Sequence, residues 1–308
     1  MRPFSFASIA TASGDQATLV VDGRHYRLDK LGLGLAPGGL RGLMDDWDGL
    51  LAKVEPVIER LAGDHGEDAA FVAAPRLVAP LRFPNKLVCV GAVYSDHLAQ
   101  FGLPPERWDR MPMFLRPPTT SIVGPGPTIV IPPTTEQFDW EIELAVVIGR
   151  RLTQGDEAAA RQAIAGYSIG IDFSCRDLLH PEGRGGVDLV RAKAQDGMAP
   201  LGPGVVPAQF VGDVQKLALK LWVNDRLRQD GTTANMLFPV AEQIATISQY
   251  ITLEPGDVVF TGSPAGSAEG DYLKPGDQIR AEIEHVGVLD LEIVSPADAV
   301  ARRQPELV

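Results

Sequence analysis

Two glutamates, Glu141 and Glu143, stand two positions apart at the start of an apolar run that ends at Ile148. Side chains alternate between the two faces of a β-strand, so both carboxylates would project from one face, with Asp139 beside them. Burying a carboxylate is costly unless a partner compensates its charge, and no Lys or Arg occurs in this segment before Arg150. A hard cation is the simplest partner. The alternative is an edge strand whose acids lie in water.

The ligand type narrows the choice of metal. Oxygen ligands alone favour Mg²⁺ or Mn²⁺, and a zinc site would require His or Cys, which this segment lacks. Asp172 closes the strand-like run 167–171. As a third carboxylate it would complete one face of an octahedral cation and leave positions for water and substrate. Its other interpretation is a cap at the end of a strand.

Two further polar residues occur where chemistry is possible. His97 follows Tyr94-Ser95-Asp96, just past a predicted buried strand, which is a usual location for functional residues. Lys193 lies in the segment 191–197. Taken alone, an isolated histidine is more often structural, and a lone lysine is more often a solvated surface group.

The first part of the chain predicts a small unit of its own. Residues 17–28 alternate apolar and polar around Asp22-Gly23, which indicates a hairpin. Apolar residues recur at helical spacing over 47–61, and Pro56 should kink or divide that helix. Residues 63–84 have the Ala, Pro, Gly and charge content of a connection. We therefore expect a small N-terminal α/β domain with its linker over 1–80 and a catalytic metal-binding domain over 81–308.

Strands dominate the second part. Short strands are predicted over 86–91 and 139–148, and a hairpin over 217–228 turns at Asn224-Asp225. Asp156 should cap a helix that ends at Gly166, and Pro239 should open another. Because strands outnumber helices without alternating one-for-one with them, the predicted fold class is α+β and β-rich rather than a doubly wound parallel sheet.

Composition excludes several classes of function. The net charge of −12 and the absence of a basic cluster with interleaved aromatics argue against nucleic acid. No apolar run reaches the roughly 18 residues that span a bilayer, so we expect no membrane role. The N-terminus lacks the pattern of a secretory signal, which predicts a cytoplasmic protein. The two cysteines, Cys89 and Cys175, fit reduced structural thiols.

Several ordered blocks resemble the fumarylacetoacetate hydrolase family of metal-dependent enzymes that act on 2-oxo and 1,3-dicarbonyl acids. The resemblance covers roughly residues 86–294. It rests on the segments 90–97, 114–118 with 122–125, the strand with Glu141 and Glu143, 166–177, 200–203 and 261–266. It implies a mixed β-sandwich roll preceded by a smaller N-terminal domain, in a protein that forms a homodimer.

The resemblance also assigns roles residue by residue. Glu141, Glu143 and Asp172 would hold Mg²⁺ or Mn²⁺, Lys193 would face the substrate beside the metal, and His97 falls on the position of the water-activating histidine. The positions near the substrate would be Arg176, Tyr94, Thr261, Gly262 and Ser263.

The chain departs from the family pattern beside that histidine. Many members have a glutamate three residues after it, where this chain has Gln100. A neutral amide can orient an imidazole but cannot stabilise its protonated form, so water activation should be weaker. Hydrocarbon side chains also replace amides that are common at three positions, which makes the expected pocket more apolar: Val93, Ile171 and Leu179.

Three hypotheses follow. The first is a Mg/Mn-dependent hydrolase that cleaves a C–C bond in an acylpyruvate-like or 1,3-dicarbonyl acid through a metal-stabilised enolate, with His97 activating water. The second is a metal-dependent decarboxylase, or a tautomerase or isomerase, of a 2-oxo or β-keto acid, which Gln100 favours. The third is a non-catalytic family member that acts as a binding subunit.

Overall fold

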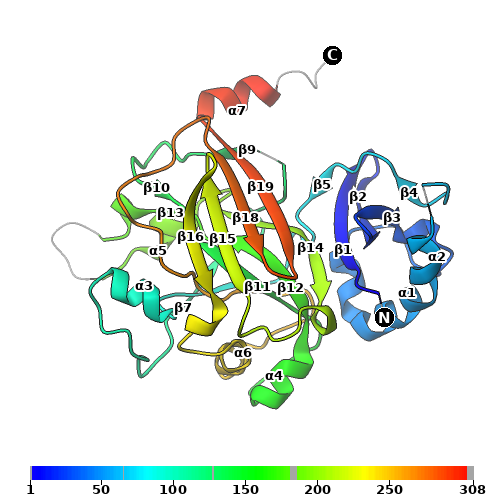
Figure 1. Cartoon of the computed structure of the whole chain (residues 1–308), viewed down its shortest axis with the longest axis horizontal. Helices are drawn as coiled ribbons and strands as arrows, with labels where there is room; N and C mark the ends of the chain where they lie inside the picture. Colours follow the sequence, from blue (N-terminus) through cyan, green and yellow to red (C-terminus); the bar gives the residue numbers. More distant parts are fainter. Residues whose placement is uncertain (1, 65, 127, 181–185, 304–308) are drawn as a thin grey trace.

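The structure is a computed structural model that describes residues 2–64, 66–126, 128–180 and 186–303. The first 80 residues form a curved antiparallel sheet with short helices packed on its outer side (Figure 1). The predicted hairpin is confirmed, with Asp22 and Gly23 at positive φ in its turn. The division of the helix at Pro56 is also confirmed. The strands are β1 (Ser5–Thr11), β2 (Gly14–Val21), β3 (Arg24–Arg27), β4 (Phe71–Val72) and β5 (Leu77–Val78), and the helices are α1 (Trp47–Val54) and α2 (Ile58–Ala62).

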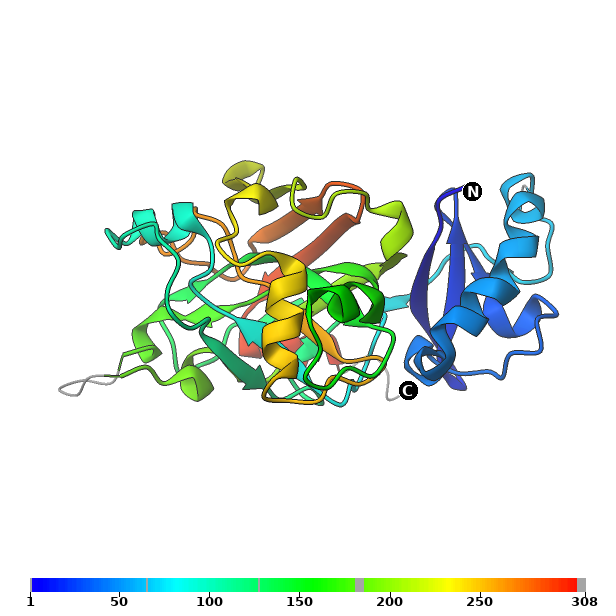
Figure 2. The same ribbon diagram turned by 90° about the horizontal axis from the view of Figure 1, so that it is seen from below.

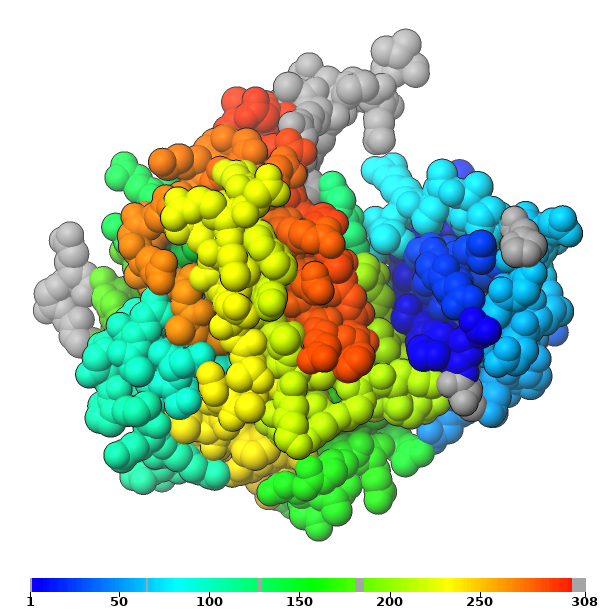
Figure 3. Space-filling view, viewed as in Figure 1, coloured from blue at the N-terminus to red at the C-terminus, as the bar shows by residue number. Residues whose placement is uncertain are grey.

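The N-terminal sheet continues into the largest sheet of the molecule. Strand β1 pairs with β14 through Phe6 and Val205, and the sheet runs on in the order β14-β12-β11-β17-β6-β7, with β8 also pairing β14. The space-filling view shows the N-terminal part, blue to cyan, lying against the rest of the chain (Figure 3). The remaining strands of this sheet are β6 (Leu87–Val90), β7 (Met113–Arg116), β8 (Ile122–Val123), β11 (Ile142–Ile148), β12 (Ile164–Ile171), β14 (Ala199–Pro207) and β17 (Val258–Phe260).

A second, five-stranded sheet packs on one face of the first. Its order is β16-β15-β18-β19-β9, and its inward residues Leu221, Ile279 and Leu291 share one apolar core with Leu144 and Val146 of β11. The other face of β11 packs with the N-terminal part. The strands are β9 (Thr128–Val130), β15 (Ala218–Val223), β16 (Arg226–Thr232), β18 (Gln278–Ile283) and β19 (Gly287–Val294); a separate pair is β10 (Phe138–Asp139) and β13 (Ser174–Cys175).

Helices are short and peripheral. Figure 2, seen from below, shows α4 and α6 side by side in front of the sheets. Asp156 caps α4 as predicted, accepting the Ala159 N–H at 2.8 Å. The predicted end at Gly166 is wrong, because α4 stops at Ala163 and Ile164 already begins β12, where strand pairing supplies the backbone hydrogen bonds. The helices of this part are α3 (Ser95–Gln100), α4 (Glu157–Ala163), α5 (Leu189–Lys193), α6 (Val240–Ser248) and α7 (Pro296–Arg303).

The strand predicted over 139–148 is divided in two. Strand β10 ends at Asp139 and β11 begins at Ile142. Between them, the Ile142 N–H donates to the side chain of Gln229 (2.9 Å), and the Glu141 carbonyl accepts the Asp172 N–H (2.9 Å). The prediction of one continuous strand was therefore wrong at its N-terminal end, because partners distant in sequence replace the regular hydrogen bonds between strands there.

The β-rich α+β class and the mixed sandwich are confirmed. The domain boundary near residue 80 stays a prediction. Within the described ranges, no helix is long and apolar enough to cross a membrane.

Candidate functional site

Three carboxylates converge where β11 begins and β12 ends. One oxygen each of Glu141, Glu143 and Asp172 lies within 4.8 Å of the others, and all three side chains are buried. Adjacent strands create this arrangement: Glu141 directly precedes β11 and Glu143 lies near its start, and β12 runs antiparallel so that Asp172 follows its last residue, Ile171, which pairs with Ile142. The expectation that the two glutamates and Asp172 lie together is met by this geometry.

Two basic side chains from distant segments reach Asp172. The Lys193 Nζ, at the end of α5, lies 2.6 Å from Glu141 Oε2 and 2.6 Å from Asp172 Oδ2. Arg116, at the end of β7, donates to Asp172 Oδ1 and is fully buried. Burial would lower the pKa of Lys193, but Asp172 and Glu141 outweigh it and raise that pKa, so the ammonium stays charged.

Arg176 holds the opposite side of Glu141. Its Nη2 donates to Glu141 Oε1 (2.6 Å) and its Nε donates to Asp139 Oδ2 (2.7 Å). Asp139 also accepts the Ala268 N–H at 2.6 Å. Asp139 therefore supports Arg176 rather than joining the three-carboxylate cluster. Although burial opposes it, the pull of Lys193 and Arg176 lowers the pKa of Glu141 well below its usual range.

Glu143 is the least compensated of the three acids. It accepts the Gly262 N–H at 2.6 Å, and among the described residues no Lys, Arg or His makes an ion pair with it. Burial, followed by the nearby charges of Asp172 and Glu141, raises its pKa well above the ordinary value. A buried acid crowded by two others calls for additional positive charge.

A divalent cation fits this cluster. The donor set consists of carboxylate oxygens alone, which suits Mg²⁺ or Mn²⁺. With Asp139, the cluster has four carboxylates against the three cations Arg116, Arg176 and Lys193. Full ionisation would leave one negative charge. A divalent ion would reverse that balance to one positive charge, which suits an anionic ligand.

His97 lies beside the cluster. Its Nε2 is 3.8 Å from Glu141 Oε1, its ring contacts Phe101 edge-on at 4.9 Å between centroids, and only 8% of the residue is exposed. Burial lowers the pKa of His97 below 6.5, so the imidazole is neutral at pH 7. The Nδ1 atom has no hydrogen-bond partner within the described part of the chain. Gln100, at the end of the same helix, bonds to the backbone of Gly266 and Ser267.

The remaining predicted positions surround the loop that follows β17. Thr261 Oγ1 donates to the Leu144 carbonyl at 2.8 Å, and Ser263 Oγ accepts from Gln229 at 2.9 Å. Gly262 has φ +87°, and a Cβ there would lie 2.4 Å from Val93 Cγ2, so a side chain would not fit. Tyr94 is fully buried, and its hydroxyl finds no partner in the described ranges.

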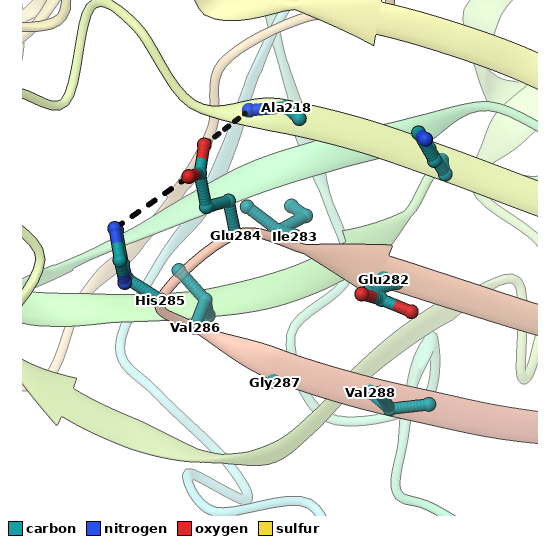
Figure 4. Close-up of a pocket in the computed structure, with 9 residues that line it drawn as sticks. Ala218, Glu282, Ile283, Glu284, His285, Val286, Gly287 and Val288 are labelled. Atoms are coloured by element: carbon teal, nitrogen blue, oxygen red, sulfur yellow. Dashed lines mark hydrogen bonds and ion pairs between the residues drawn. The ribbon is translucent and has the colours of Figure 1, made fainter.

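An open recess elsewhere on the surface does not share these features. It is lined by the ends of β15, β18 and β19 (Figure 4). There Glu284 accepts the Ala218 N–H at 3.2 Å and lies 3.6 Å from His285 Nε2, and both side chains are exposed. Because these groups face water and one another, this recess offers no converging set of buried ligands.

Comparison with known proteins identifies the family. The family model described as the C-terminal domain of fumarylacetoacetate (FAA) hydrolase matches residues 86–294. The chain belongs to the fumarylacetoacetate hydrolase family. It is 37% identical over 221 residues to a mitochondrial oxaloacetate tautomerase of Bos taurus, a match that covers 70% of this chain and 69% of the relative.

Two further relatives of the family extend into the N-terminal part. A 2,4-didehydro-3-deoxy-L-rhamnonate hydrolase of a Sphingomonas species is 36% identical over 80% of this chain and 87% of its own. The crystal structure of maleylpyruvate hydrolase from Sphingobium sp. SYK-6, in complex with manganese(II) and pyruvate, superposes with a TM-score of 0.75 at 27% identity. That superposition covers 96% of this chain and 99% of the other.

Two contributors to the site were not predicted from the sequence. Arg116 carried no predicted role, although a charged residue that ends the apolar strand 113–116 is itself a signal of burial against an acid. Gln229 accepts the Ile142 N–H and donates to the Ser263 hydroxyl and the Pro264 carbonyl, so both ends of its amide are bonded. Nothing local in the exposed-looking sequence of β16 marks it, because its partners are more than 30 residues away.

Proposed function

We propose that the protein is a divalent-metal-dependent hydrolase of acylpyruvate-type or other 1,3-dicarbonyl acids. The single observation that carries the proposal is the convergence of Glu141, Glu143 and Asp172 with Lys193 and the neutral His97 on one buried site. A relative that covers both parts of the chain is named as a hydrolase and was crystallised with manganese and pyruvate. This relative supports a cation bound by oxygen ligands and a 2-oxo acid as the two ligands that we propose for the site of this chain.

Glu141, Glu143 and Asp172 would hold the cation, which supplies Lewis-acid polarisation of a 2-oxo acid when it is bound. The other steps fall to the residues of the chain. His97 takes a proton from water, and the resulting hydroxide adds to the distal carbonyl carbon. The bond between that carbon and the methylene breaks, and its electron pair forms the enolate of pyruvate. The Lys193 ammonium stabilises this negative charge, and the proton then goes to carbon. The products are a carboxylic acid and pyruvate.

A labelling experiment tests the reaction. Acylpyruvates and oxaloacetate are incubated with Mg²⁺ or Mn²⁺ in ¹⁸O water, and the products are read by mass spectrometry. Hydrolysis of an acylpyruvate places solvent oxygen in the released acid and yields pyruvate, whereas pyruvate and CO₂ from oxaloacetate would indicate decarboxylation. His97→Ala should lower kcat by roughly a hundredfold or more. Cleavage that is unaffected by this substitution would contradict the proposal.

The acid side of the pH profile gives a second readout. Because burial lowers the pKa of His97, the base remains neutral down to below pH 6.5, so kcat/KM should fall only below that value. A cation bound nearby lowers this pKa further, in the same direction. An acid limb above pH 7 would exclude His97 as the base.

Keto–enol tautomerisation is the second candidate. It needs the same enolate but no attacking water, and with Gln100 bonded to Gly266 and Ser267, the His97 Nδ1 atom has no hydrogen-bond partner among the described residues. Oxaloacetate tautomerases are among the relatives. Enol–keto conversion with no cleavage product, and hence no released acid that carries ¹⁸O, would select this candidate. A homodimeric state and a cytoplasmic location remain predictions.

A further inference from the structure

The α3 helix, which carries His97, is fastened at both of its ends. At its start, Ser95 Oγ donates to the Asn235 carbonyl (3.3 Å), and Asp96 Oδ2 accepts from Asn235 Nδ2 (3.0 Å). At its end, Gln100 Oε1 accepts the Gly266 N–H at 3.0 Å, and Gln100 Nε2 donates to the Ser267 carbonyl. His97 lies between these two attachments, so both of them limit where its ring can be.

The loop that receives Gln100 is itself rigidly held. Gly266 has φ +105°, and a Cβ there would lie 2.2 Å from the Arg228 carbonyl oxygen, so a side chain would not fit at this position. The Gly266 carbonyl accepts from Trp140 Nε1 at 3.2 Å. An attachment to this loop therefore transmits its position to α3.

The same loop is connected to the carboxylate cluster. Ser267 Oγ accepts from Arg176 Nη2 at 3.2 Å, and that nitrogen also donates to Glu141 Oε1 at 2.6 Å. Glu141 Oε1 is in turn 3.8 Å from His97 Nε2. The contacts form a closed ring that runs from His97 through Glu141, Arg176 and Ser267 to Gln100 and back along α3. The Gln100 contact closes it.

Only an amide fits at this position. One end of the Gln100 side chain must accept from an N–H and the other must donate to a carbonyl. A glutamate of the same length would turn a second acceptor toward the Ser267 carbonyl, and the two oxygens would repel each other. Both ends of the amide bond to the backbone of this loop, and within the described residues the His97 Nδ1 has no hydrogen-bond partner.

We infer that Gln100 is a positioning residue: it fastens α3 to the 266–267 backbone and so sets the distance of His97 from the carboxylates, rather than acting on the imidazole. The inference rests on the proposed function for the role of His97. In this role, Gln100 sets the geometry in which His97 reacts. The contacts that this chain's 266–267 loop makes would then require a glutamine at this position.

The test uses Gln100→Glu and Gln100→Ala in the full chain, with Gln249→Glu as the matched control. Gln249 is exposed at the end of α6 and bonds the Gly155 carbonyl, so it undergoes the same exchange of amide for acid away from the site. Hydrogen–deuterium exchange is followed by mass spectrometry in peptides covering 95–101 and 264–268. Both Gln100 variants should exchange roughly tenfold faster there, and the control should match the parent.

Kinetics separates positioning from other roles. In both Gln100 variants kcat should fall roughly tenfold while KM and the Kd for Mn²⁺ stay within about twofold. An unchanged exchange rate, or faster exchange with unchanged kcat, would overturn the inference. A higher kcat in Gln100→Glu would also overturn it, since that result makes residue 100 the partner of the ring. If the parent protein turns over no 2-oxo acid, the proposed function fails while exchange still decides whether Gln100 fastens α3.

Discussion

Two buried carboxylates lie at the two ends of β17, and their surroundings differ. Asp257 precedes the strand. Its oxygens accept from the Lys86 N–H (2.9 Å) and the Glu254 N–H (2.7 Å), and Lys86 Nζ lies 2.8 Å away. Glu143 lies at the other end, beside Gly262. It receives one backbone N–H at 2.6 Å and faces two more acids.

The difference separates an acid whose partners compensate much of its charge from one that is crowded by other acids. Both side chains are almost fully excluded from solvent, so burial alone does not distinguish them. Asp257 has a cation and two backbone donors, which offset part of the cost of its burial, although burial still raises its pKa. Glu143 keeps an unmet demand for positive charge, and this demand is what a metal ion can satisfy.

Replacing Glu143 and Asp257 by their amides should give the largest difference between the two ends of β17. In Glu143→Gln the Kd for Mn²⁺ should rise roughly a hundredfold or more, because a ligand is lost, while Tm without metal stays equal or rises as crowding is relieved. In Asp257→Asn the free energy of unfolding should fall by about 2–4 kcal/mol with the Kd unchanged. Calorimetric titration and thermal unfolding measure both. Equal effects of the two variants on metal binding would remove the distinction.

Lys193, beside the carboxylate cluster, and Lys86, beside Asp257, allow a second matched comparison. Lys193→Met removes the charge that the proposed mechanism places beside the enolate, so kcat should fall on the order of 10²–10³-fold while Mn²⁺ still binds. Lys86→Met is the matched change at the other end and should lower stability without lowering kcat. Steady-state kinetics on the preferred substrate and urea unfolding give the two readouts. A large loss of kcat in Lys86→Met would mean that the surroundings of Asp257 also affect the reaction at the carboxylate cluster.

Proton linkage gives the smallest effect. Because the pKa of Glu143 is raised in the fold, the side chain stays protonated at pH values where the unfolded chain is ionised. Its contribution to the stability of the metal-free protein is present below the unfolded value near 4.5 and is lost as pH rises through the folded pKa. Metal binding needs the carboxylate, so it should release up to about one proton below that pKa, and Mn²⁺ affinity should rise with pH.

Calorimetric titrations in two buffers of different ionisation enthalpy count the released protons. Glu143→Gln should abolish the proton release that comes from Glu143, and Asp257→Asn should leave the number of released protons unchanged. Proton release of the same size in Glu143→Gln would assign the linkage to another group.

Local pattern determined much of this protein. The period of two in 142–148 put the apolar residues of β11 alternately into two cores, and the spacing of Glu141 and Glu143 indicated that the two carboxylates lie together. The turn at Asp22-Gly23, the break at Pro56 and the cap at Asp156 are all local effects, because each depends on backbone conformations that a few neighbouring residues fix. The ordered blocks over residues 86–294 also identified the family.

Tertiary structure alone decided which partners the acids have. Arg116 is 56 residues from Asp172, Lys193 is 52 residues from Glu141, and Gln100 is 166 residues from Gly266. Such pairs form only where strands and loops distant in sequence cross within the reach of a side chain, and no local pattern specifies that crossing. The sequence could therefore state that the buried acids need positive charge, and only the fold could distribute it so that Glu143 remained without its own.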